Sequence, residues 1–255
     1  MEERIRQYIQ DIEKMQDVKV LLACETGSRA WGFPSPDSDY DVRLIYKHRT
    51  DWYLSLLESK DTFEVMFENN NFDISGWDIK KTLGLLWKSN PPLLERIQSP
   101  IIYAVDEEFH AGINTLAQQC YSRIATIHHY LSMAKKCFEE LKGKESYKLK
   151  KFFYALRAAT ACLWILKHDQ MPPIRFQELM SGIDIPLGLR KRIDELIELK
   201  SGKNESYLHE GEADLIVFIE NTIVLAEDQG KFLPAANGDI QALDSFFRQM
   251  VKEEL

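Results

Sequence analysis

The sequence of 255 residues has no apolar run that approaches the ~20 residues needed to span a membrane. Its first residues, Met-Glu-Glu-Arg, are charged and lack the apolar centre of a secretory signal. Cysteine is scarce, since only four occur, and no two of them form a Cys-x-x-Cys pair. Together these absences predict a cytoplasmic protein with reduced thiols and no membrane partner.

Signatures of several other protein classes are also missing. No period of roughly 20–50 residues repeats, and no segment is of low complexity, which excludes a solenoid. The sequence contains neither a Gly-x-x-x-x-Gly-Lys phosphate loop nor a Ser-His-Asp order of the kind that hydrolases use. The net charge of −8 provides no global attraction to nucleic acid or to an anionic membrane.

Two short segments near the N-terminus carry the chemistry. An apolar run over 18–24 predicts a buried strand, and Gly27-Ser28 ends it. Glycine permits a tight turn and a close approach to a ligand, and the Ser28 hydroxyl and the N–H groups after it can face an anion. Ten residues later, Asp39 and Asp41 lie two apart, so on a strand they point the same way. Two carboxylates on one face repel each other unless a metal ion or a shared proton lies between them.

This combination resembles the nucleotidyltransferase superfamily of the DNA polymerase β type. The wording Gly-Ser-Arg-Ala-Trp-Gly at 27–32, followed by Asp-Ser-Asp-Tyr-Asp-Val-Arg at 37–43, is similar to a bacterial and phage family of predicted nucleotidyltransferases associated with RNA repair. Three later stretches extend the likeness, at 73–83, 88–91 and 99–103. The resemblance covers roughly the first 105 residues well and the remainder more weakly.

The resemblance implies an enzyme that moves an NMP group from an NTP to an acceptor hydroxyl with a divalent metal. Mg²⁺, or Mn²⁺ in its place, suits such a site because it prefers oxygen ligands. Asp39 and Asp41 are then catalytic metal ligands. A third carboxylate normally comes from a neighbouring strand, between apolar residues, and Asp73 fits best. Asp78 is its competitor but is better explained as part of a first helical turn, and Glu64 is a weaker third option.

Five residues are predicted to bind the nucleotide cofactor-substrate: Gly27, Ser28, Arg29, Lys81 and Lys151. Each has a structural alternative. Ser28 can act as a helix N-cap, Arg29 can be an ordinary surface residue, and Lys151 belongs to a basic run that solvent alone can explain. Arg43, beyond Asp41 on the same strand, can simply pair with the carboxylates.

Hydrophobic periodicity predicts an α+β fold. An N-terminal mixed β-sheet nucleotidyltransferase core with helices on one side is expected over residues 1–105, followed by an all-helical C-terminal domain over 106–255. The expected strands are 18–24, 40–46, 62–67, 72–75 and 101–105. From residue 106 onward β-branched alternation disappears and long helical patterns replace it.

The sequence leaves the acceptor open. The family's association with RNA repair implies an RNA end, whereas a small hydroxyl compound or a protein side chain is the alternative within the same chemistry. A third possibility is a nucleotide- or RNA-sensing module without turnover, although such a module has no need of three converging acids. NTP is the expected partner of the enzyme.

Overall fold

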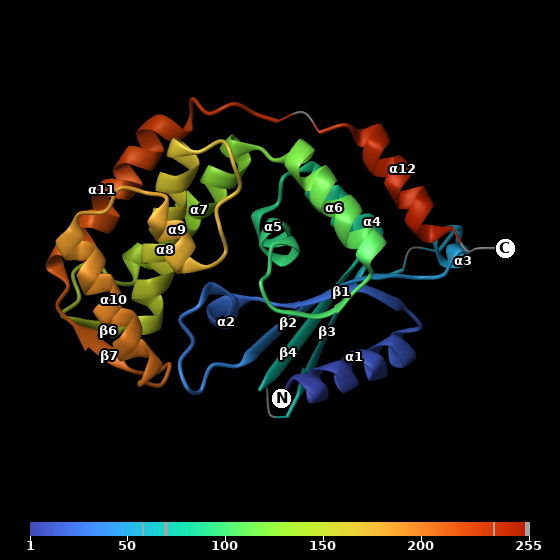
Figure 1. Cartoon of the computed structure of the whole chain (residues 1–255), viewed down its shortest axis with the longest axis horizontal. Coiled ribbons are helices and arrows are strands. Elements are labelled where there is room, and N and C mark those ends of the chain that lie inside the picture. Colours follow the sequence, from blue (N-terminus) through green and yellow to red (C-terminus); the bar gives the residue numbers. More distant parts are fainter. Residues whose placement is uncertain (58, 69–70, 237, 253–255) are drawn as a thin grey trace. The chain divides into compact units, whose positions relative to one another are not determined.

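The computed structural model describes residues 1–57, 59–68, 71–236 and 238–252 and divides the chain into two compact units (Figure 1). The first unit consists of Met1–Ala30, Asp39–Tyr121 and Ala236–Leu255, and the second of Trp31–Ser38 and Ser122–Ala235. Within the described ranges, every helix is too short or too polar to cross a membrane.

A five-stranded mixed sheet forms the centre of the first unit, in the order β3-β4-β2-β1-β5. Its strands are β1 (Lys19–Glu25), β2 (Tyr40–Lys47), β3 (Thr62–Phe67), β4 (Phe72–Asp78) and β5 (Ile102–Val105). β2 and β4 run parallel, and the other neighbours are antiparallel. The predicted mixed sheet is therefore confirmed, with β4 extending three residues beyond its expected end.

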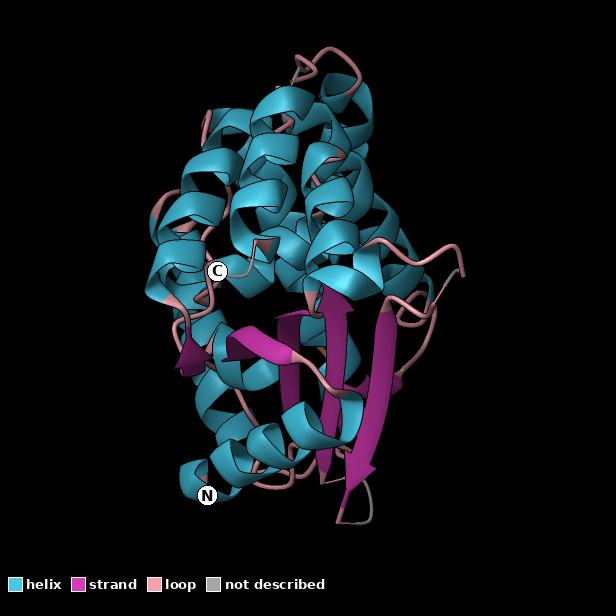
Figure 2. Cartoon of the chain, turned by 90° about the vertical axis from the view of Figure 1, so that its right-hand side faces the viewer, coloured by secondary structure: helices cyan, strands magenta, loops and turns pink. Residues whose placement is uncertain are grey.

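Helices cover both faces of this sheet. On one face, α1 (Glu2–Gln16) buries Ile5, Ile9 and Ile12 against apolar residues of β1, β2 and β4. The opposite face receives α4 (Ile79–Trp87), α5 (Pro91–Ile97) and α6 (Glu107–Cys120). Figure 2 shows the strands in magenta and, starting at the label N, the helix that covers the first face.

The expectation of helices on one side of the sheet is therefore wrong. The physical reason is that the central strand β1 is buried on both faces from Val20 to Glu25, so helices must pack on each face of the sheet. On the second face, the Arg96 guanidinium of α5 stacks 3.3 Å from the Trp77 ring centroid.

The first unit is completed by elements from distant parts of the chain. α3 (Thr50–Tyr53) follows β2, and α12 (Ile240–Val251) packs against α4 and α6. At that contact, Gly112 lies directly under the Phe246 ring. This division differs from the predicted boundary at residues 105 and 106, since α6 and α12 belong with the sheet rather than with the second unit.

The second unit is mainly helical. Its elements are α7 (Arg123–Glu139), α8 (Leu149–Lys167), α9 (Phe176–Ser181), α10 (Leu187–Ser201), α11 (Ala213–Gly230) and the two strands β6 (Ser146–Lys148) and β7 (Leu208–Glu210). α8 is buried along most of its length and contacts α7 and α11. The two strands pair antiparallel, so the prediction of an all-helical C-terminal domain is wrong. The hydrophobic pattern did not indicate them because strands of three residues are too short to show an alternating pattern.

The segment 31–38, which separates the Gly-Ser turn from the aspartate pair, belongs to the second unit. Phe33 stacks 5.0 Å from Phe153. The Lys200 ammonium donates to the Ser35 hydroxyl at 2.8 Å. This segment is therefore an ordered part of a packed core rather than a free loop.

Candidate active site

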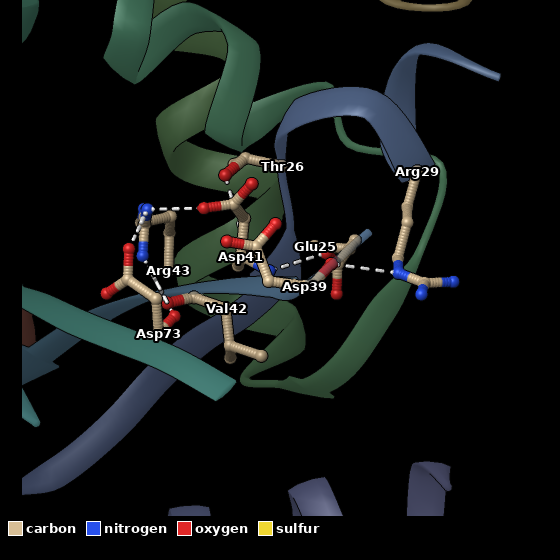
Figure 3. Close-up of polar contacts among 8 residues, drawn as sticks. All are labelled: Glu25, Thr26, Arg29, Asp39, Asp41, Val42, Arg43 and Asp73. Carbon is tan, nitrogen blue, oxygen red and sulfur yellow. Dashed lines mark hydrogen bonds and ion pairs between the residues drawn. The ribbon is translucent and has the colours of Figure 1, made fainter. Parts of the chain in front are cut away.

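Asp41 is held through both of its backbone groups at the edge where β1 ends. Its N–H donates to the Glu25 carboxylate at 2.8 Å, and its carbonyl accepts from the Thr26 N–H at 2.9 Å and from the Thr26 hydroxyl at 3.1 Å (Figure 3). Glu25 pairs in register with Val42, so the antiparallel ladder brings these groups together. The position of the Asp41 side chain is thus fixed by the strand that precedes the Gly-Ser turn.

The Gly-Ser turn closes directly over the Asp41 carboxylate. Gly27 has a φ of +65° and begins the short helix α2 (Gly27–Trp31). A Cβ at Gly27 would lie 2.3 Å from Asp41 Oδ2, far inside van der Waals contact. Ser28 follows with its side chain buried. Glycine is therefore required here for both the backbone conformation and the close approach.

Asp73 reaches the same place from the neighbouring strand. β2 and β4 run parallel with Asp41 opposite Asp73, so the two side chains share one face of the sheet. Arg43, two residues beyond Asp41, donates through Nη2 to Asp41 at 2.8 Å and to Asp73 at 2.7 Å. The predicted pairing of Arg43 with the carboxylates is confirmed.

The surroundings of Arg43 favour the charged form of its guanidinium. Burial opposes the charge, but the hydrogen bond that Arg43 donates to Asp73 and the negative charges of Asp41 and Asp73 outweigh burial and raise the pKa of the Arg43 guanidinium. One positive charge therefore stands between two of the three predicted catalytic acids.

Asp39 comes just before β2, and its carboxylate points to the same side as that of Asp41 in Figure 3. Arg29 supports it from α2, since its Nε donates to the Asp39 carbonyl at 3.0 Å. The Arg29 guanidinium also stacks 3.9 Å from the Tyr40 ring centroid. The structure thus brings Gly27, Ser28, Arg29, Asp39, Asp41 and Asp73 into one region of the first unit.

The competing acids lie elsewhere. Asp78 is at the other end of β4, five residues and about 16 Å from Asp73 along the strand. It caps α4 by accepting from the Lys80 N–H at 2.7 Å, and the Tyr53 hydroxyl donates to it at 2.7 Å. The predicted helix-start role of Asp78 is confirmed. Glu64 is exposed on β3 opposite Ser75.

One of the two predicted nucleotide-binding lysines, Lys81, lies away from these carboxylates within the first unit. Lys81 lies at the Asp78 end of β4 and pairs with Asp61 at 2.9 Å. Lys151 is on α8 of the second unit and pairs with Glu140 at 2.9 Å. The phosphate-binding roles that the sequence suggested for both lysines stay predictions.

Comparison with known proteins agrees with this geometry. A family model described as RlaP, the RNA repair pathway DNA polymerase beta family, matches residues 1–249. The chain belongs to this family. The resemblance inferred from the Gly-Ser and Asp-x-Asp segments is therefore confirmed, and it extends beyond the first 105 residues to nearly the whole RlaP-family chain.

One curated relative and one solved structure also match the RlaP-family chain. The uncharacterized protein YcgL of Bacillus subtilis (strain 168) is 39% identical over 241 residues, which cover 94% of this chain and 92% of the relative. The nucleotidyltransferase-like protein from Exiguobacterium sibiricum 255-15 covers 96% of this chain and 79% of its own, at 9% identity and a TM-score of 0.28.

The carboxylates of this RlaP-family site offer ligands of the type that a divalent cation needs. Among the described residues no cluster of three or more His, Cys, Asp or Glu side chains is gathered as a metal site, and Arg43 pairs with both Asp41 and Asp73. All the donors are nevertheless carboxylate oxygens, and Asp73 Oδ1 is buried without a hydrogen-bond partner. An unpartnered buried carboxylate oxygen is costly unless a cation or a donor reaches it. Asp39, Asp41 and Asp73 therefore fit Mg²⁺ or Mn²⁺ by chemistry.

Glu25 is the residue of this site that sequence reasoning missed. Its side chain is fully buried and receives hydrogen bonds from the Asp41 N–H and the Tyr103 hydroxyl. Burial raises the pKa of the Glu25 carboxyl to about 7, although both hydrogen bonds favour its charged form. The available signal was an acid at the end of an otherwise apolar run, immediately before Thr-Gly-Ser.

We expect Glu25 to give folding stability a distinct pH dependence. Its pKa is about 7 in the folded state and 4.5 when unperturbed, so the folded chain holds the proton more tightly. The resulting stabilisation is fully present below pH 4.5 and is lost as the pH rises through about 7, an effect on the order of 3 kcal/mol. Glu25→Gln cannot titrate and should lack this decline.

The measurement is denaturant unfolding of the wild type and Glu25→Gln across that pH range. Glu64→Gln, which removes an exposed carboxyl from the same sheet, is the matched control. We expect the wild-type and Glu64→Gln curves to fall together while Glu25→Gln stays flatter. Parallel curves for all three proteins would contradict the assignment.

Proposed function

We propose that the chain is a divalent-metal-dependent nucleotidyltransferase that moves an NMP group from an NTP to the hydroxyl of an RNA end. The observation that carries this proposal is the register of Asp41 opposite Asp73, with Gly27 closed over the Asp41 carboxylate. That arrangement places two acids and the Gly-Ser turn close together at one end of the central strands. The RNA repair pathway description of the family supports the choice of acceptor.

Each residue has a distinct role in the proposed reaction. Asp39 and Asp41, completed by Asp73, would hold Mg²⁺, which would supply charge stabilisation at the α-phosphate and at the attacking and leaving oxygens. Gly27 and Ser28 bind the phosphates through the turn, where the absence of a Cβ allows close approach. Asp73 orients the acceptor hydroxyl and takes up its proton. Arg29 keeps Asp39 in place through the main-chain carbonyl.

The net charge of −8 favours a short RNA end over a long duplex, because phosphate-backbone binding depends on clustered positive charge. The basic run of the second unit does not alter this expectation. Lys150 pairs with Glu205 at 2.6 Å, and Lys151 pairs with Glu140. A small hydroxyl compound or a protein side chain remains the second acceptor class to test.

The test is incubation of the purified chain with each α-labelled NTP and Mg²⁺ or Mn²⁺. The acceptors are tRNA, RNA oligonucleotides with defined 3′ and 5′ ends, aminoglycosides and a protein mixture. We expect metal-dependent label on an RNA end. Label on another acceptor would support transferase activity but identify a different acceptor class. NTP binding without label on any acceptor would favour a sensing module.

Substitutions at Asp73 and Asp78 should affect different properties, the reaction rate at Asp73 and the free energy of unfolding at Asp78. Asp73→Asn is expected to keep NTP–Mg²⁺ affinity within several-fold while its single-turnover rate falls by about 10²–10⁴-fold, the usual range for a lost general base. Asp78→Ala removes the cap of α4 and should instead lower the free energy of unfolding by roughly 0.5–2 kcal/mol with little change in rate. Single-turnover rates and thermal unfolding of both variants, measured side by side, check this. The reverse pattern would identify Asp78 rather than Asp73 as the third catalytic carboxylate.

A further inference from the structure

Arg43 makes two kinds of contact with different consequences. Its Nη1 donates to main-chain carbonyls, that of Asp73 at 2.9 Å and that of Val42 at 3.2 Å. Its Nη2 donates to the two carboxylates of Asp41 and Asp73. The Nη1 contacts tie the guanidinium to β2 and β4, whereas the Nη2 contacts neutralise the acids.

Nη2 lies between two of the acids that would hold a divalent cation. It lies 2.8 Å from Asp41 Oδ1 and 2.7 Å from Asp73 Oδ2, on the face where the strand register places both acids (Figure 3). The three side chains are each about one-fifth exposed, so water screens their charges only in part. A second cation placed between the same two oxygens would meet the positive charge of Arg43 at short range.

We infer that Arg43 is an internal counter-cation that competes with the divalent metal for Asp41 and Asp73 and so sets how tightly the site binds it. The inference rests on the proposed metal-dependent function. Nη2 would have to leave at least one carboxylate for a divalent ion to bind there, whereas the main-chain bonds of Nη1 would keep the guanidinium beside the site. Arg43 therefore stabilises the metal-free fold and weakens metal binding with the same group.

This pair of opposite effects distinguishes a competing cation from a merely structural residue. Removing Arg43 leaves Asp41 and Asp73 facing each other without a positive charge, which destabilises the metal-free protein. The same loss removes the competitor, so a divalent ion should bind more tightly. A residue that only supports the fold would lower stability and metal affinity together.

The test uses Mn²⁺ as the probe, with the full chain and no nucleotide. We expect Arg43→Met to lower the thermal midpoint by roughly 2–6 °C and to bind Mn²⁺ roughly three- to tenfold more tightly in an electron paramagnetic resonance titration. Arg43→Lys keeps the charge without the fork of donors, so its thermal midpoint and its Mn²⁺ affinity should lie between those of the wild type and Arg43→Met. Arg6→Met, which removes a charge paired with Glu2 on α1, controls for net charge.

A second measurement needs no variant. The guanidinium NMR signals of Arg43 in the wild type should shift when diamagnetic Mg²⁺ is added. Mg²⁺ binding without a shift would overturn the inference, as would Mn²⁺ affinity in Arg43→Met equal to or weaker than wild type. Both outcomes leave the proposed function standing, whereas a wild type and variants that all fail to bind either metal would overturn the metal-dependent function as well.

Discussion

Asp41→Asn should lose nucleotidyl transfer by on the order of 10³-fold or more and keep its fold. The substitution preserves the size of the side chain and both backbone clamps, the N–H to Glu25 and the carbonyl to Thr26. It removes the negative charge that the proposed metal site requires. Stability should change little, because an amide oxygen can still accept from Arg43. Asp39→Asn is expected to behave in the same way.

The same segment contains a matched control. Asp37 lies two residues before Asp39, but its carboxylate accepts from the Glu205 N–H at 2.9 Å within the second unit. Asp37→Asn should retain transfer. The measurement is the single-turnover rate with α-labelled NTP, together with thermal unfolding for each protein. A folded Asp41→Asn variant that turns over at the wild-type rate would show that Asp41 is not a metal ligand.

The parts of the fold that local sequence could predict are those whose signal lies within one element. The apolar run that became β1 and the helical stripe that became α1 are read from neighbouring residues alone. The Gly-Ser turn and the Asp-x-Asp spacing are local in the same sense, so Gly27, Asp39 and Asp41 could be named as candidate site residues from the sequence alone. Asp73 could be placed because it sits between two apolar strand residues.

The remaining features depend on pairing between distant segments. Only the parallel register of β2 and β4 sets Asp41 opposite Asp73, and that register gives Arg43 both carboxylates at once. The antiparallel register of β1 and β2 likewise brings Glu25, which lies one residue beyond the predicted strand 18–24, to accept the hydrogen bond from the Asp41 N–H.

The division of the chain shows the same limit. Segment 31–38 is held in the second unit by aromatic packing of Phe33 and by the bond between Lys200 and Ser35, contacts more than 100 residues apart in sequence. α12 joins the sheet-containing unit by packing against α4 and α6. Composition and periodicity along the chain contain no signal for such partners.

Gly27→Ala is expected to be the most damaging substitution of a residue without a functional side chain. An alanine at φ +65° costs about 1–2 kcal/mol in backbone strain alone. Its Cβ would also fall 2.3 Å from Asp41 Oδ2, so either the turn or the carboxylate must move. A displacement of about 1 Å at a reacting centre can reduce the rate by roughly 10²-fold, and we expect a loss of at least that size together with weaker NTP binding.

Gly143→Ala separates strain from the clash. Gly143 has a similar φ of +71°, but no atom lies within 4 Å of the Cβ that alanine would add. This variant should lose about the same 1–2 kcal/mol of stability and retain transfer. The measurements are chemical denaturation, calorimetric NTP affinity and single-turnover rate for both variants. Equal rates in the two variants would show that the approach of Gly27 to Asp41 has no role in the reaction.

A double-mutant cycle tests whether the clash acts through Asp41. If Gly27→Ala slows transfer by displacing the Asp41 carboxylate, it should add little to the rate loss of Asp41→Asn, because the group it displaces is already inactive. Strictly multiplicative losses would instead mean that the turn contributes independently, through its own contacts with the NTP phosphates. Either result assigns the effect of Gly27 to a named group, the Asp41 carboxylate in the first case and the phosphate-binding turn in the second.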